Sequence, residues 1–252
     1  MISVLSDMMS YTFIVRAMIV GGLVALCSAL LGVSLVLKRY SMIGDGLSHV
    51  AFAALTIAVA MNVAPLYIST PIVTVAAIIL LRLSENSKIK GDSAIALIST
   101  VSIAIGVVVT ALTKGMNTDV YSYMFGSILA MSESDVYMSI ALSVVVIILF
   151  VFFYNKIFAV TFDESFAKAT GTRADVYNMI IAVLTAITIV VGMRIMGTML
   201  ISSLIIFPAL ISMRNFKTFK SVIICSAIVS VVCFLLGIIL SYLYSIPTGA
   251  SI

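Results

Sequence analysis

The only histidine of the chain, His49, follows an aspartate, Asp45, by four residues in an otherwise apolar stretch. If this stretch is helical, both side chains lie on one face of the helix, one turn apart. A carboxylate oxygen and an imidazole nitrogen that converge in this way can bind a divalent transition-metal ion such as zinc, manganese or iron. The spacing therefore predicts two metal ligands. Two ligands do not complete a site, and the alternative is a structural pair in which His49 only satisfies Asp45 inside a helical bundle.

The composition favours the metal ligands over the structural pair because it places them in a membrane. Hydrophobic residues make up 63% of the 252 residues, charged residues 10%, and the mean hydropathy is +1.29. These values are typical of a multi-pass membrane protein, in which ionisable residues are costly and usually mark a transport pathway. The basic excess, 14 Lys and Arg against 10 Asp and Glu, then reports orientation in the membrane. No basic cluster is interleaved with aromatic residues, so no nucleic-acid partner is expected.

Apolar runs long enough to cross a bilayer predict an all-α bundle of about eight transmembrane helices. No repeat of fixed period is visible, so residues 1–252 are expected to form a single transmembrane domain. In the first run, Gly21, Ala25 and Ala29 recur at four-residue spacing, which predicts close approach of a neighbouring helix. The predicted spans cover residues 12–37, 44–61, 66–83, 93–113, 136–154, 176–191, 195–213 and 222–244.

Basic residues gather in alternate connections, and this pattern predicts the orientation. Because cytoplasmic loops carry the excess of Lys and Arg, the N-terminus is predicted to face outward. Arg16, Lys114 and Arg194 then lie outside or near the outside, and a short interfacial helix is expected at 119–127 in the acidic outer connection. The other eleven basic residues, all in connections assigned to the cytoplasm, are Lys38, Arg39, Arg82, Lys88, Lys90, Lys156, Lys168, Arg173, Arg214, Lys217 and Lys220.

Residues 161–171, in the most polar connection, are typical of a short amphipathic helix. Thr161 can cap its N-terminus and Gly171 can end it. Two acidic residues in its first turn suit the positive end of the helix dipole. The apolar face of this helix would lie either on the membrane surface or against a cytoplasmic partner protein. The residues of this face and of the acidic turn are Phe162, Phe166, Ala169, Asp163 and Glu164.

The seventh predicted span contains Pro208 near its middle. Proline removes a backbone hydrogen bond and bends a helix, so we expect a kink at Pro208. Interrupted helices are used by transporters to line a binding site, and they also occur for purely structural reasons.

Over nearly its whole length the chain resembles the membrane permeases of the zinc, manganese and iron family of ATP-binding cassette (ABC) importers. The most specific match is the stretch from Lys38 to His49, which includes the string Gly44-Asp45-Gly46-Leu47-Ser48-His49. Further matches support the resemblance mainly through their order along the chain. They are residues 123–130, residues 162–167 before Gly171, the segment from Gly197 to Pro208-Ala209, and Pro247-Thr248-Gly249.

The resemblance implies an all-helical permease of the vitamin B12 importer type, located in the cell (plasma or inner) membrane among membrane lipid. It further implies a homodimer, a cytoplasmic ABC ATPase subunit and an extracellular or periplasmic metal-binding protein. In that family the positions matching Asp45 and His49 line the metal path, and the helix matching residues 162–170 couples to the ATPase. We therefore expect metal contacts from Asp45 and His49, possible pathway residues at Ser48, Ser99, Thr100 and Pro208, and ATPase coupling through Phe162, Asp163, Glu164 and Phe166.

Two departures from the family pattern affect these expectations. Family members usually continue after the Pro-Thr-Gly string into another apolar segment, whereas this sequence ends at Ile252, so we expect either a bundle without that helix or a longer chain. Some zinc-type members carry a second histidine in the fourth span, where this chain has Ser99 and Thr100. With one histidine the pattern slightly favours manganese or iron over zinc, although their ligand chemistries overlap.

The sequence contains no G-x-x-x-x-G-K-[ST] string and therefore no phosphate-binding loop of its own. We expect a transport subunit rather than an enzyme, without a permanently bound cofactor, whose partner hydrolyses ATP while the path alternates between its two openings. The rival interpretation is an ion- or proton-coupled secondary transporter or channel, in which Asp45 and His49 relay protons. Such a protein would need no docking helix. A non-transporting scaffold would leave the Asp-His pair unexplained.

Overall fold

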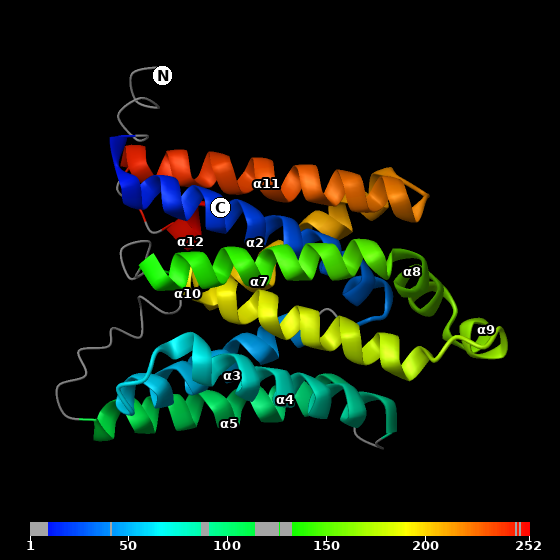
Figure 1. Ribbon diagram of the computed structural model, residues 1–252, viewed down its shortest axis with the longest axis horizontal. Helices are drawn as coiled ribbons and strands as arrows, with labels where there is room; N and C mark the ends of the chain where they lie inside the picture. Colours follow the sequence, from blue (N-terminus) through cyan, green and yellow to red (C-terminus); the bar gives the residue numbers. More distant parts are fainter. Residues whose placement is uncertain are drawn as a thin grey trace.

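The computed structural model describes residues 10–40, 42–86, 91–113, 126, 133–244, 246 and 248–252. Within these residues the chain is helical without strands, and eight segments are long and apolar enough to cross a membrane (Figure 1). The predicted all-α bundle of eight spans is confirmed. The helices are α2 (Thr12–Leu37), α3 (Ile43–Ala60), α4 (Pro65–Asn86), α5 (Gly91–Leu112), α7 (Glu133–Phe152), α8 (Tyr154–Phe162), α9 (Glu164–Ala169), α10 (Ala174–Asn215), α11 (Phe219–Tyr244) and α12 (Thr248–Ser251).

The long helix α10 lies at the centre of the bundle. It packs against α2, α7 and α11 on one side and against α3 and α4 on the other. Helix α3 in turn packs against α4 and α5, and Figure 1 shows these three helices together at the lower edge of the bundle. Any residue that α3 presents toward α10 therefore lies between the two groups of helices.

The small residues of α2 bring α11 into close contact, as their spacing predicts. The Ser230 hydroxyl of α11 donates to the Ala25 carbonyl oxygen at 2.9 Å, and a Cβ added at Gly21 would lie 2.0 Å from the tip of the Phe234 ring. Such a short distance leaves no room for any side chain at Gly21. The stripe that includes Ala29 is therefore a helix-packing surface.

The backbone of α10 breaks at Gly197 rather than at Pro208. Gly197 has φ 82° and ψ 169°, a conformation that is essentially restricted to glycine, and it lies at the start of the second of the two spans of α10, Ala174–Arg194 and Met196–Asn215. The predicted turn between the sixth and seventh spans is thus a single glycine. Pro208 lies inside the helical part of α10, and the kink expected there stays a prediction.

The polar end of the bundle contains α8 and α9. In Figure 1 these two short helices lie at the right-hand end, where α2 and α7 end and α10 and α11 begin. This end carries Lys38, Lys168 and Lys217, which agrees with the predicted cytoplasmic assignment. The expected helix at 119–127, the matching stretch 123–130 except Gly126, Ser41, Pro247 and the basic residues Lys88, Lys90 and Lys114 lie outside the described residues.

Candidate functional site

A compact turn places Asp45 at the start of α3. Helix α2 ends with Arg39 in the left-handed region at φ 62°, and the Tyr40 amide donates to the Leu35 carbonyl oxygen at 2.8 Å. This pattern is a Schellman-type helix end. The Ile43 amide then donates to the Tyr40 carbonyl oxygen at 3.0 Å and α3 begins. Asp45 consequently lies in the first turn of α3, where the helix dipole favours a negative charge.

Asp45 and His49 converge on one face of α3, as predicted. The distance from His49 Nε2 to Asp45 Oδ2 is 3.7 Å, and the side chains are 22% and 41% exposed in the single chain. This distance is too long for a hydrogen bond. Two ligands that each lie about 2.0–2.2 Å from a common ion can be up to about 4.4 Å apart. The two atoms can therefore share one metal ion.

Glycines hold this turn of α3 tightly against its neighbours. A Cβ added at Gly46 would lie 2.6 Å from Ile95 Cγ2 of α5, and one at Gly44 would lie 3.2 Å from Ile205 Cδ1 of α10. The first turn of α3 is thus clamped between α5 and α10. Ser202 of α10 faces the Asp45 carboxylate from across this contact.

The remaining predicted pathway residues lie in different surroundings. Ser48 is fully buried and its hydroxyl donates to the Asp45 carbonyl oxygen at 2.7 Å. On α5, Ser99 is partly buried and Thr100 is exposed, with its hydroxyl donating to the carbonyl oxygen of Ala96 in the preceding turn. Pro208 is buried in the second half of α10. Their roles in a pathway stay predictions.

The predicted cytoplasmic helix is present, but it begins later and is shorter than expected. Helix α9 covers Glu164–Ala169, and its N-cap is Asp163, whose carboxylate accepts from the Phe166 amide at 2.9 Å. Thr161 instead lies buried in the last turn of α8. Asp163 has an extended backbone that separates the two helices, and an aspartate is at least as good a cap as a threonine. Gly171, at φ 84°, terminates the turn after α9 as predicted.

The side chains of α9 divide into an exposed aromatic group and a charged group. Phe162, just before the cap, and Phe166 are each 64% exposed. Glu164 turns toward the bundle and receives Lys38 Nζ at 3.2 Å, Asn178 Nδ2 at 3.1 Å and Lys168 Nζ at 2.9 Å. Burial opposes ionisation of Glu164, but the hydrogen bonds from these three residues outweigh it and lower its pKa to about 2. Glu164 is therefore an anion at neutral pH.

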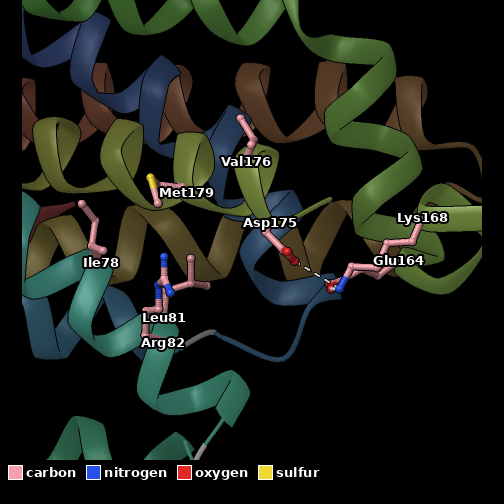
Figure 2. Close-up of a pocket in the computed structure, with 8 residues that line it drawn as sticks. All are labelled: Ile78, Leu81, Arg82, Glu164, Lys168, Asp175, Val176 and Met179. Carbon is pink, nitrogen blue, oxygen red and sulfur yellow. Dashed lines mark ion pairs between the residues drawn. The ribbon is translucent and has the colours of Figure 1, made fainter. Parts of the chain in front are cut away.

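A cavity of about 540 Å³ opens at this end of the bundle, between α4, α9 and α10. Figure 2 shows Lys168 reaching from α9 to Asp175 at the start of α10, with Glu164 beside them, and the two charged groups of the ion pair are 3.1 Å apart. Arg82 approaches the cavity from α4. The lining residues are Ile78, Leu81, Arg82, Glu164, Lys168, Asp175, Val176 and Met179.

Sequence reasoning missed contacts that join distant segments. At the opposite end of the bundle from α9, the Arg194 guanidinium of α10 lies 2.7 Å from the Asp135 carboxylate of α7, and both side chains are mostly buried. The sequence signal for this ion pair was the presence of opposite charges, Asp135 and Arg194, at the ends of two predicted spans. Ser202 had a weaker signal, a serine pair within an apolar span. Among the described residues, no group of three or more His, Cys, Asp or Glu could hold a metal ion.

Comparison with known proteins identifies the family. Residues 10–252 match the ABC 3 transport family. The chain belongs to this family. The manganese transport system membrane protein MntC of Halalkalibacterium halodurans is 26% identical over 247 residues, 98% of this chain and 84% of the relative. A probable metal transport system membrane protein of Thermotoga maritima is 31% identical over 248 residues, 98% of this chain and 88% of the relative.

A further relative and two solved structures are similar to this chain over most of its length. The high-affinity zinc uptake system membrane protein ZnuB of Haemophilus influenzae is 29% identical over 238 residues, 94% of this chain and 90% of the relative. The structure of PsaBC from Streptococcus pneumoniae in complex with Fab superposes with a TM-score of 0.88, at 26% identity, over 100% of this chain and 91% of that one. An inward-facing putative metal-chelate type ABC transporter shares the fold, with a TM-score of 0.77, 16% identity and coverage of 94% and 80%.

Membership in the ABC 3 transport family, together with the eight apolar spans, makes the chain a multi-pass protein of the cell membrane. The resemblance in the sequence is thereby confirmed at the level of the family and of the fold.

Proposed function

We propose that this chain is the membrane-spanning permease subunit of an ATP-driven importer of a divalent transition-metal ion. The observation that carries the proposal is the Asp45–His49 pair on α3, whose 3.7 Å separation suits shared ligation of one ion. Relatives that match most of the chain are named as manganese and zinc transport proteins. The ion is the cargo of the protein, so it must be bound weakly enough to be released again.

The ligand types favour manganese or iron over zinc. Each chain offers one carboxylate oxygen and one imidazole nitrogen, a mixed set that is harder than a site of several histidines or thiolates. Zinc stays a possible cargo, because it also accepts these two ligands.

A second copy of the chain would complete the metal site. Asp45 and His49 supply two ligands, and a transition-metal ion takes four or more. Both side chains are partly exposed in the single chain, so they are open to a partner surface. We propose a homodimer in which symmetry brings two Asp45–His49 pairs together, because a two-fold axis repeats each ligand.

The energy would come from a separate ATPase, since the sequence has no phosphate-binding loop. The exposed Phe162 and Phe166 beside α9 form the docking surface in this proposal. Two exposed aromatic side chains, one at the end of α8 and one in α9, suit the buried centre of a protein interface. A metal-binding protein on the other side of the membrane would deliver the ion to the path.

The requirement for ATP tests the importer against the rival secondary transporter. Permease reconstituted in proteoliposomes with its ATPase is expected to take up manganese only when ATP is supplied on the ATPase side. Permease alone in an imposed proton gradient is expected to take up none. Uptake driven by that gradient without the ATPase would support the rival, in which Asp45 and His49 relay protons.

A further inference from the structure

A lysine with little access to solvent joins three helices at the cytoplasmic end. Lys38, the C-cap of α2, has a side chain that is 9% exposed. Its ammonium group donates to Asn178 Oδ1 of α10 at 2.5 Å and lies 3.2 Å from Glu164 Oε2 of α9. Asn178 is 3% exposed, and its amide donates to the same Glu164 oxygen at 3.1 Å. Lysine is almost never buried unless it is paired, so Lys38 depends on this arrangement. Lys38, Asn178 and Glu164 are here named the bridge.

The bridge is a major attachment of α9 to the membrane helices. The apolar side of α9 buries Ala167 in a small cluster with Val160 of α8 and Ala174 of α10. On the side facing α4, the 540 Å³ cavity lies between α9 and the bundle. This cluster, with Ala159 and Tyr177 packed against it, is small compared with the core of the bundle and buries correspondingly little apolar surface. Charged hydrogen bonds at 3.2 Å or less are stronger and directional. A displacement of α9 would therefore also displace the Lys38 side chain, which is bonded to Glu164.

From Lys38 a short hydrogen-bonded turn leads to the metal ligands. The Lys38 amide donates to the Ser34 carbonyl oxygen, so Lys38 belongs to the last turn of α2. Tyr40 closes that helix end and its carbonyl oxygen accepts from the Ile43 amide, the first residue of α3. Asp45 follows in the same turn of α3. Lys38, Tyr40 and Ile43 are held by these backbone hydrogen bonds, and Asp45 follows Lys38 by only seven residues, so a movement of Lys38 can reach Asp45 through a short connection.

From these contacts we propose that the bridge is the coupling element that links the docking helix α9 to the metal ligands, with Lys38 and Glu164 as positioning residues for transport. The inference rests on the proposed function. It goes beyond that function in assigning the path along which ATPase movement reaches the metal site. In this proposal the exposed Phe162 and Phe166 bind the ATPase. Glu164 faces the bundle instead and transmits the movement of α9 to Lys38.

The test measures metal ions transported per ATP hydrolysed in the reconstituted permease–ATPase complex. Lys38→Met and Glu164→Gln are expected to keep ATPase binding and ATP hydrolysis while the ratio falls by about fivefold or more, the lower limit of typical coupling between sites. Lys38→Arg keeps the charge and the donors and is expected to retain most of the ratio. Lys168→Gln is the matched control, because Lys168 binds the same carboxylate from the exposed side without contacting α2 in this network. Its ratio is expected to stay within about twofold of wild type.

Two outcomes would overturn the inference. The first is an unchanged ratio in Lys38→Met and Glu164→Gln at normal protein yield. The second is loss of extractable protein in both variants, which would make the bridge a folding element only. Failure of the proposed function gives a different result, since the wild-type complex would then show no ATP-dependent manganese uptake before any variant is compared.

Discussion

At the scale of single residues, the Asp45–His49 pair differs from a structural pair in distance and exposure. A structural pair buried in a bundle would be expected within hydrogen-bonding distance, whereas these atoms are 3.7 Å apart. Asp45 is 41% exposed in the single chain, so it does not depend on His49 to replace lost water. Both observations favour a role in which the two side chains are available to bind a metal ion.

His49→Ala and Asp45→Asn are each expected to abolish manganese uptake, because each removes one of two ligands supplied by the chain. Assembly is expected to survive, since methyl and carboxamide groups are easier to accommodate in a membrane than the original groups. Uptake and detergent-extracted yield are measured together for both variants. In the structural alternative the results reverse: the stranded partner costs about 1–3 kcal/mol, yield falls, and the remaining folded protein still transports.

The sequence predicted the residues of this pair and their contact because a four-residue spacing on a helix is a local relation. Ser202 and Asn178 could not be assigned in the same way. Ser202 meets Asp45 only because α10 packs against α3, and Asn178 meets Lys38 only because α10 starts beside the end of α2. A polar residue in an apolar span can be noticed in the sequence, but its partner on another helix cannot be read from local spacing. They depend on the tertiary packing of helices that are more than a hundred residues apart.

At the scale of elements, α9 shows that the capping residue determines where a short helix begins. Its existence and its glycine end were predictable from composition, but its start was misplaced, because Asp163 competes with Thr161 for the cap. The break in α10 lies at Gly197, close to the turn expected between the sixth and seventh spans. A proline inside a membrane helix is tolerated, whereas φ 82° at Gly197 requires a glycine.

Phe166→Asp is expected to prevent co-purification of the ATPase and to leave the bundle folded. Phe166 is 64% exposed, so the permease itself loses little when the ring is replaced. At an interface, the new carboxylate would be desolvated without a partner. The measurement is the amount of ATPase retained on tagged permease, with Phe166→Leu as a control that keeps an apolar side chain. Normal ATPase recovery with normal uptake in Phe166→Asp would remove α9 as the docking helix.

Gly197→Ala is expected to lower stability by about 1–3 kcal/mol, because alanine is strained at φ 82° and ψ 169°. Gly22→Ala in α2 is the matched control: no atom lies within 4 Å of the added Cβ, and alanine favours a helix. Thermal unfolding midpoints in detergent are compared for the two variants. A midpoint for Gly197→Ala at or above that of Gly22→Ala would show that stability does not depend on a glycine at this break.

At the scale of the whole molecule, the bundle has a polar end and an apolar middle, and the distribution of basic residues predicts its orientation in the membrane. Among the described residues, the first of the eight spans, α2, begins at the same end of the bundle at which the last, α11, ends. The end with α8 and α9 carries most of the basic residues, including Lys217 between α10 and α11. By the charge bias of membrane loops, this end faces the cytoplasm, where an ATPase could reach α9.

Labelling of lysines with a membrane-impermeant reagent tests this orientation. Lys217 is exposed, and it is expected to react in inverted membrane vesicles and to be protected in intact cells or right-side-out vesicles. Lys114 is predicted from the sequence to lie on the opposite side and should show the reverse pattern, which makes it an internal control. Mass spectrometry of the labelled protein distinguishes the two sites, and permeabilised membranes establish that both can react. Labelling of Lys217 from outside an intact cell would invert the bundle, place α9 away from any cytoplasmic ATPase, and overturn the importer proposal together with its coupling path.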